Sequence, residues 1–232
     1  MAEWDGEPNG LKFLNPHELV IADYRNGLMA CDVRTGNVRP YLQRRNSERF
    51  KGVNDLVFDR QGNLYFTDQG QTGLHDPTGR VYRYDAAGKL TMLVGTVPSP
   101  NGLVMNKAEN VLYVGVTRGN AVWRLPLMAD GSASKVGLFI QMSGGHAGPD
   151  GMALDEEGGL VIAHPSTTAW RFDPLGRPTH HVDCGDDIYC TNVAFSGRDL
   201  YVVVSRQSAK FASGTILKAT MPVAGKPMFS HA

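Results

Sequence analysis

A short motif recurs along this chain of 232 residues at nearly constant spacing, and it constrains the fold more than any other feature. The copies read PNGLKF at 8–13, VNDLVF at 53–58, PNGLVM at 100–105, PDGMAL at 149–154 and TNVAFS at 191–196. The repeated polar position is Asn9, Asn54, Asn101, Asp150 and Asn192, with separations of 45, 47, 49 and 42 residues. Periods of roughly 40–50 residues with short strands are typical of β-propeller blades.

The sequence between the copies predicts β-hairpins. Each motif leads into a short apolar run, a polar turn and a second apolar run, as in LVF, DRQGN and LYFTD after the second copy. Later runs in which Gly follows shortly after Asp, such as MACDVRTGNV and VYRYDAAGKL, indicate turns and predict a third and a fourth strand. Glycine is abundant, with 27 residues, and helical periodicity is lacking. We therefore expect an all-β chain, a single β-propeller domain over residues 1–232.

The repeated polar position predicts a cation site. The first strand of each propeller blade lines the central channel, so equivalent positions should converge on one ring. Side-chain amides with one carboxylate are the hard oxygen ligands that Ca²⁺ and Mg²⁺ prefer. The alternative is that these residues only cap turns. The carboxylate of Asp150 favours the cation, because a charge in such a ring would otherwise carry an uncompensated desolvation cost.

Charge and composition exclude several classes of function. Positive and negative side chains balance, which gives no reason to expect nucleic acid or an anionic membrane as partner. The acidic N-terminus lacks the apolar region of a signal peptide. Three cysteines, Cys31, Cys184 and Cys190, suit a reduced cytoplasm, and we expect them to be buried thiols rather than a zinc site. No serine-hydrolase, zincin or phosphate-loop motif is present in the sequence.

The motifs resemble those of the gluconolactonase and senescence-marker-protein family, which includes six-bladed lactonases. The similarity runs essentially from end to end and is carried by VNDLVFDRQGNLYFTD at 53–68, SPNGLVMNKAENVLYV at 99–114 and GHAGPDGMALDEEGGLVIA at 145–163. The resemblance implies hydrolysis of a lactone or a related ester at the propeller channel, and it implies one bound divalent cation. That cation is usually Ca²⁺, with Mg²⁺, Mn²⁺ and Zn²⁺ as alternatives.

The resemblance also implies roles for individual residues. By position, the family's metal-binding Asn falls on Asn101 and its metal-binding Asp on Asp150. The family's ND pair, which lines the substrate pocket or helps to hold the metal, falls on Asn54 and Asp55. The cation would polarise the carbonyl, and Asp150 would activate water or attack directly.

Two departures from the family pattern modify these expectations. Six blades need about 280 residues at this period, whereas the chain has room for about five. We expect the first blade, with the family's ligand Glu, to be the missing one. Gly52 stands where sugar-handling members carry Arg, which favours a less polar lactone as substrate.

Two further residues are candidates for the substrate pocket. His146 precedes the GPDG sequence and could contact substrate or shuttle protons, or it could be a loop histidine bonded to backbone. Asp68 ends the LYFTD run, at a predicted strand end near the channel face.

Two classes of function remain open from the sequence. The first is a metal-dependent lactonase or esterase, and the second is a catalytically inactive or truncated propeller that binds ligands or partners. A missing blade would also leave an open edge, which favours a homodimer.

Overall fold

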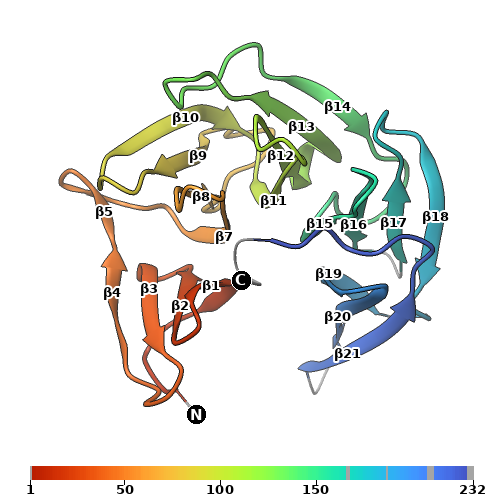
Figure 1. Cartoon of the computed structure of the whole chain (residues 1–232), viewed down its shortest axis with the longest axis horizontal. Coiled ribbons are helices and arrows are strands. Elements are labelled where there is room, and N and C mark those ends of the chain that lie inside the picture. The colour runs from red at the N-terminus through yellow and green to blue at the C-terminus, as the bar shows by residue number, and fades with distance from the viewer. Residues whose placement is uncertain (1, 166–167, 187, 208–211, 229–232) are drawn as a thin grey trace. The chain divides into compact units, whose positions relative to one another are not determined.

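The computed structural model describes residues 2–165, 168–186, 188–207 and 212–228. Four four-stranded sheets, one three-stranded sheet and a short two-stranded ribbon make up the fold (Figure 1). In the five larger sheets each strand pairs antiparallel with its neighbour in the sequence. Helix within the described residues is limited to one 3₁₀ turn, η1 (Thr117–Gly119). The all-β fold with five propeller blades, as predicted from the repeat, is confirmed.

The blades follow one another along the sequence. Blade 1 consists of β1 (Pro8–Asn15), β2 (Glu18–Asp23), β3 (Gly27–Asp32) and β4 (Val38–Leu42). The ribbon of β5 (Arg44–Arg45) and β6 (Glu48–Arg49) precedes blade 2, which is formed by β7 (Val53–Phe58), β8 (Leu64–Asp68), β9 (Gly79–Tyr84) and β10 (Leu90–Val97). Blade 3 consists of β11 (Pro100–Met105), β12 (Val111–Val116), β13 (Ala121–Pro126) and β14 (Gly137–Gln141).

Blade 4 consists of β15 (Met152–Leu154), β16 (Leu160–His164), β17 (Thr168–Phe172) and β18 (Pro178–Asp183). Blade 5 has three strands, β19 (Tyr189–Ser196), β20 (Asp199–Gln207) and β21 (Ala212–Thr220).

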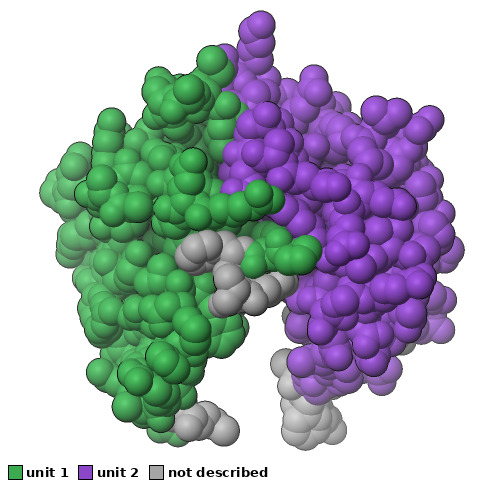
Figure 2. Space-filling model, in the orientation of Figure 1, with its two compact units in different colours: residues 1–101, 127–133, 227–232 green, residues 102–126, 134–226 purple. Residues whose placement is uncertain are grey.

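The chain divides into two compact units (Figure 2). Unit 1 comprises residues 1–101, 127–133 and 227–232, and unit 2 comprises residues 102–126 and 134–226. Blades 1 and 2 belong to unit 1, whereas blades 4 and 5 and most of blade 3 belong to unit 2. That the whole chain is a single domain stays a prediction.

Each unit has an apolar core between neighbouring blades. In unit 1, Leu28 of blade 1 packs with Leu56, Phe66 and Tyr82 of blade 2. In unit 2 the core joins blade 4 to blade 5, and its members from β16 and β20 are Val161, Ala163, Leu200, Val202 and Val204. Alternate residues of β20 are therefore buried, as expected for a sheet with one face against a core.

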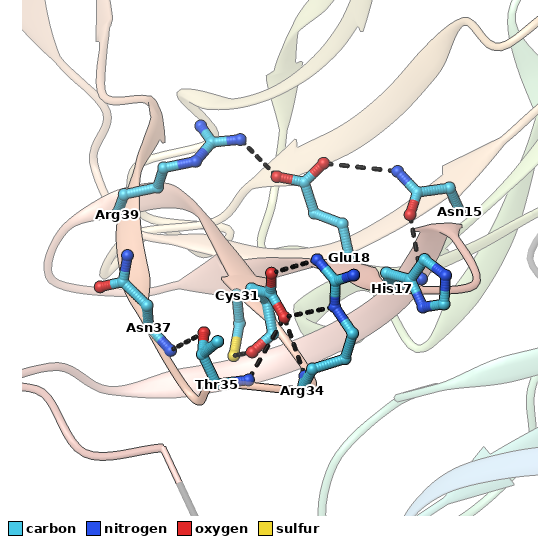
Figure 3. A network of polar contacts seen from close by, with 9 residues as sticks. Asn15, His17, Glu18, Cys31, Arg34, Thr35, Asn37 and Arg39 are labelled. Atoms are coloured by element: carbon cyan, nitrogen blue, oxygen red, sulfur yellow. Dashed lines mark hydrogen bonds and ion pairs between the residues drawn. The ribbon is translucent and has the colours of Figure 1, made fainter.

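The sequences in which Gly follows Asp by three or four residues form the tight hairpin turns that their pattern predicts. In the turn between β3 and β4, Asp32 Oδ1 accepts hydrogen bonds from the backbone N–H groups of Arg34 (2.8 Å) and Thr35 (3.3 Å), two residues seen in Figure 3. Hydrogen bonds from the Arg34 side chain and backbone lower the pKa of Asp32 well below its usual range. In the same way, Asp59 Oδ1 accepts from the backbone of Gln61 and Asn63. These carboxylates serve the turns.

Candidate active site

The repeated polar residues lie in or beside the first strand of each blade. Four of them, Asn9, Asn54, Asn101 and Asn192, are within β1, β7, β11 and β19, and Asp150 lies two residues before β15. Asn54 and Asn101 are buried, Asp150 and Asn192 are half-buried, and Asn9 is exposed. Four of the five copies are therefore strand residues, and Asn192 Oδ1 accepts the backbone N–H of its neighbour Val193 (2.8 Å).

The glycine of the motif has a packing role. Gly10, Gly102 and Gly151 do not have the positive φ of turn glycines. A Cβ on any of them would lie 2.8 Å from the Cα atom of a residue in the next copy of the motif, which is Asp55, Gly151 and Asn192, respectively. Contacts this short are prohibitive, so the Asn-Gly and Asp-Gly pairs mark places where first strands of adjacent blades touch.

The side-chain amide nitrogen of Asn54 is hydrogen-bonded within the protein. Its Nδ2 donates to Gln69 Oε1 (2.8 Å), and Gln69 Nε2 donates to Ser99 Oγ (2.8 Å). Ser99 is 4 % exposed and has a φ of 64°, in the left-handed region that non-glycine residues seldom adopt. With Nδ2 used in this way, Oδ1 is the atom of Asn54 that is oriented to act as a ligand or acceptor.

Asp55 and Asn101 are linked through a buried threonine. Thr67 Oγ1 donates to the Asn101 carbonyl oxygen (2.8 Å), and the same hydroxyl accepts the backbone N–H of Asp55 (3.1 Å). The Asp55 carboxylate accepts the backbone N–H of Leu56 (2.8 Å). Within the described part of the chain, no hydrogen bond holds the side-chain amide of Asn101, which is 7 % exposed.

Asp150 is held by its backbone although it lies outside any strand. Its N–H donates to the Ala163 carbonyl (2.9 Å), and the N–H of Gly151 donates to the Thr191 carbonyl of blade 5 (2.9 Å). The preceding residue, Pro149, accepts a hydrogen bond from Thr117 Oγ1 (2.8 Å). Residues of blades 3, 4 and 5 thus hold the backbone around the half-buried Asp150.

Asp68 holds the backbone of the segment that precedes Asn54. It is fully buried, and its Oδ1 accepts the backbone N–H of Gly52 (2.9 Å). Its Oδ2 has no hydrogen-bond partner among the described residues, and the nearest cation, Arg80 Nη1, is 3.9 Å away. Burial raises the pKa of Asp68, against the lowering effect of the Gly52 hydrogen bond and of Arg80. Direct contact with a substrate stays a prediction for this residue.

A buried histidine that the sequence did not single out lies beside the Asp150 segment. His164 ends β16, directly after the Ala163 carbonyl that binds the Asp150 amide. It is 2 % exposed, its Nε2 lies 3.1 Å from Asn120 Oδ1, and burial lowers its pKa. The sequence feature that could have indicated His164 is its place at the end of LVIAH, the strand that pairs with the first strand of blade 4. His146, the predicted substrate contact, is exposed in the segment before β15.

Two features are lacking among the described residues. They contain no group of three or more His, Cys, Asp or Glu residues arranged to hold a metal ion. Nor do they include any helix with the length and apolar character needed to cross a membrane.

The chain belongs to the family described as the SMP-30/Gluconolactonase/LRE-like region, whose model matches residues 2–206. The family resemblance that the motifs indicated is thereby confirmed. The lactonase drp35 of Staphylococcus epidermidis is 34 % identical over 149 residues, which cover 62 % of this chain and 45 % of that lactonase. The chain spans about half the length of the curated relatives it matches.

Solved structures show the same fold. A luciferin-regenerating enzyme superposes with a TM-score of 0.82 at 20 % identity, over 98 % of this chain and 82 % of that one. A calcium-binding protein, regucalcin, from Agrobacterium tumefaciens superposes with a TM-score of 0.76 at 23 % identity, over 97 % of this chain and 79 % of that one.

Proposed function

We propose that the protein hydrolyses a lactone or a related ester, with Asp150 as its general base or nucleophile. The observation that carries this proposal is that Asp150 is the one carboxylate at a repeated position otherwise occupied by amides. Its backbone N–H donates to the Ala163 carbonyl, and the N–H of the next residue, Gly151, donates to the Thr191 carbonyl. A carboxylate held in place and still half-exposed is suited to take a proton from water or to attack a carbonyl carbon.

The proposed cofactor is Ca²⁺, held by side-chain oxygens of Asn101, Asp150 and Asn54. The donor set fits this ion, because two amide oxygens and a carboxylate are hard ligands. Asn54 uses its Nδ2 on Gln69, which leaves Oδ1, and no described residue holds the Asn101 amide. Regucalcin, which has the same fold, is a calcium-binding protein. When bound, the cation would polarise the substrate carbonyl. Mg²⁺, Mn²⁺ and Zn²⁺ are the alternatives that a titration should compare.

The remaining residues of the proposed site would bind and position the substrate. Asn54 can direct its amide oxygen but cannot accept the proton, so its role is orientation. Asp55 and Asp68 shape the same segment, because the first contacts the β7 backbone and the second holds Gly52. His146, exposed ahead of Asp150, would contact substrate from the loop.

Hydrolysis of a panel of small lactones, with Ca²⁺ and with chelator, tests the proposal. Asp150→Asn keeps the shape and an oxygen ligand and removes the charge, so turnover should fall by roughly 10²–10⁴ while circular dichroism stays unchanged. Asp130→Asn, in an exposed turn, is the matched control and should retain full activity. Turnover that survives both chelator and Asp150→Asn would refute the mechanism. If no lactone or ester is opened in excess Ca²⁺, the protein is a binding propeller instead.

We also propose that the protein self-associates through blade 5. The face of this blade opposite the core carries large exposed apolar side chains, and they are Tyr189, Tyr201, Val203 and Ile216. Ile216 is 67 % exposed and pairs with Val203 across β20 and β21. A second copy would cover this face and the open edge of β21.

Sedimentation velocity of wild type and Ile216→Lys tests the association. The wild type should sediment as a dimer at micromolar concentration, and the variant should shift to monomer because a charge is placed on the apolar face. Leu175→Lys, at an exposed turn residue on blade 4, is the control and should leave the dimer intact. Identical monomeric profiles for all three proteins would refute the proposal.

A further inference from the structure

Two of the three cysteines belong to the same buried cluster between blades 4 and 5. Cys184 follows β18 directly and Cys190 is the second residue of β19, so five residues separate them. Both belong to the apolar core of unit 2, together with Ala169, Ile188 and Val204. Cys190 is fully buried, whereas Cys184 retains 8 % exposure. All three cysteines are free thiols.

The two thiols lie in the same buried cluster. Their side-chain interaction lowers the pKa of Cys184 and raises that of Cys190. Cys184 Sγ also lies 3.5 Å from the Val182 carbonyl oxygen. A thiol that is favoured as thiolate and has some exposure can react with a small oxidant, and a neighbouring buried thiol can then resolve the product.

Cys31 has no second cysteine in its apolar cluster and provides an internal comparison. It lies in β3 of unit 1, 5 % exposed, packed with Ile21 and Met29. Its Sγ lies 3.7 Å from the Asp32 carbonyl oxygen, so its neighbour is a backbone group rather than a thiol.

We propose that Cys184 and Cys190 form an oxidisable dithiol that closes to a disulfide in the presence of a peroxide. The Cys184 thiolate attacks one peroxide oxygen and the O–O bond breaks, giving a sulfenic acid at Cys184 and hydroxide. Cys190 sulfur then attacks the Cys184 sulfur, the S–O bond breaks, and the Cys190 proton leaves with the hydroxyl group as water. Over both steps two thiols lose two hydrogens and one peroxide is reduced to two waters. This site is independent of the proposed hydrolase chemistry.

Peptide mapping of the full chain after hydrogen peroxide tests the proposal directly. Arg177 precedes proline, so trypsin releases both cysteines on one peptide, residues 172–198, while Cys31 falls on another. The expected result is that peptide 172–198 loses two hydrogens, that reactive thiols fall from three to one, and that dithiothreitol restores them.

Variants identify the order of events. Cys31→Ser should keep the loss of two hydrogens, and Cys190→Ala should trap a sulfenic acid at Cys184 that dimedone labels. The wild-type map does not depend on any variant folding. Over-oxidation of Cys184 without a disulfide would overturn the proposal, as would a disulfide between chains or equal oxidation of Cys31 and Cys184.

Discussion

Asn54 illustrates how a single side chain acquires its orientation from residues distant in sequence. Its amide is fixed by Gln69, Gln69 is fixed by Ser99, and Ser99 adopts a left-handed backbone conformation directly before the next motif. Strain of this kind persists only where surrounding contacts enforce it. The chain thereby aligns a polar residue of one blade with the entry of the following blade's first strand.

His164 gives the protein a predictable response to acid. Burial depresses its pKa in the folded state below the ordinary value of 6.5. The unfolded chain therefore binds a proton more readily, so the stability associated with neutral His164 is present above about pH 6.5 and is lost as pH falls toward and through the depressed pKa. Chemical denaturation at pH 7.5 and 5.5 should show wild type losing stability at the lower pH.

The loss should be smaller in His164→Gln, which cannot take up a proton. His17→Gln, at an exposed turn, should behave as wild type does. An equal loss of stability between pH 7.5 and 5.5 in wild type and His164→Gln would contradict the assignment.

Repetition in the sequence indicated the candidate polar residues, and it gave no indication of His164, which occurs once. Asn54, Asn101 and Asp150 were proposed because they occupy the same position in successive repeats, and their role stays a prediction. His164 was missed because its burial depends on tertiary contacts, namely the Asn120 side chain and the loop at Gly145, whose Cβ would overlap the imidazole. No local pattern encodes those contacts.

At the scale of elements, the close approach of first strands depends on glycine. A Cβ at Gly102 would overlap the Asp150 carbonyl oxygen and lie 2.8 Å from Gly151 Cα, and neither is a flexible side-chain end. Gly102→Ala should therefore destabilise the protein by about 1–3 kcal/mol, as overpacking does. Urea denaturation followed by circular dichroism provides the measurement.

Gly137→Ala is the matched control for this substitution. Gly137 is also in a strand, and the nearest atom to its Cβ would be the Lys135 carbonyl oxygen at 3.9 Å. Its variant should remain within about 1 kcal/mol of wild type. Similar stabilities for the two variants would show that the first strands can separate without cost.

Strand positions were predicted well where hairpin pairing alone decides them. β7 and β11 have the bounds of the motifs VNDLVF and PNGLVM. β15 is shorter than PDGMAL and starts at Met152. At this point the Asp150 N–H donates to the Ala163 carbonyl of β16, and the Gly151 N–H donates instead to Thr191 of blade 5, a contact that the hairpin alone does not provide.

For the molecule as a whole, the proposed cation should act as a stabilising ligand. Binding to the folded state alone raises stability by roughly 2.7 kcal/mol when Ca²⁺ reaches about 100 times its dissociation constant. The thermal midpoint should rise with Ca²⁺ and return to its starting value with chelator. Asp150→Asn should reduce the shift, because it removes the charged ligand, and an equal shift in wild type and variant would place Ca²⁺ elsewhere.

The backbone bonds around Asp150 have a consequence for hydrogen–deuterium exchange. Its amide and that of Gly151 donate to carbonyls of β16 and of β19, although Asp150 itself lies in no strand. These two amides should exchange at the slow rate of paired strands, whereas the exposed residues 143–146 just ahead of them should exchange rapidly. Protection from exchange should therefore rise steeply between residue 146 and Asp150, the proposed catalytic residue.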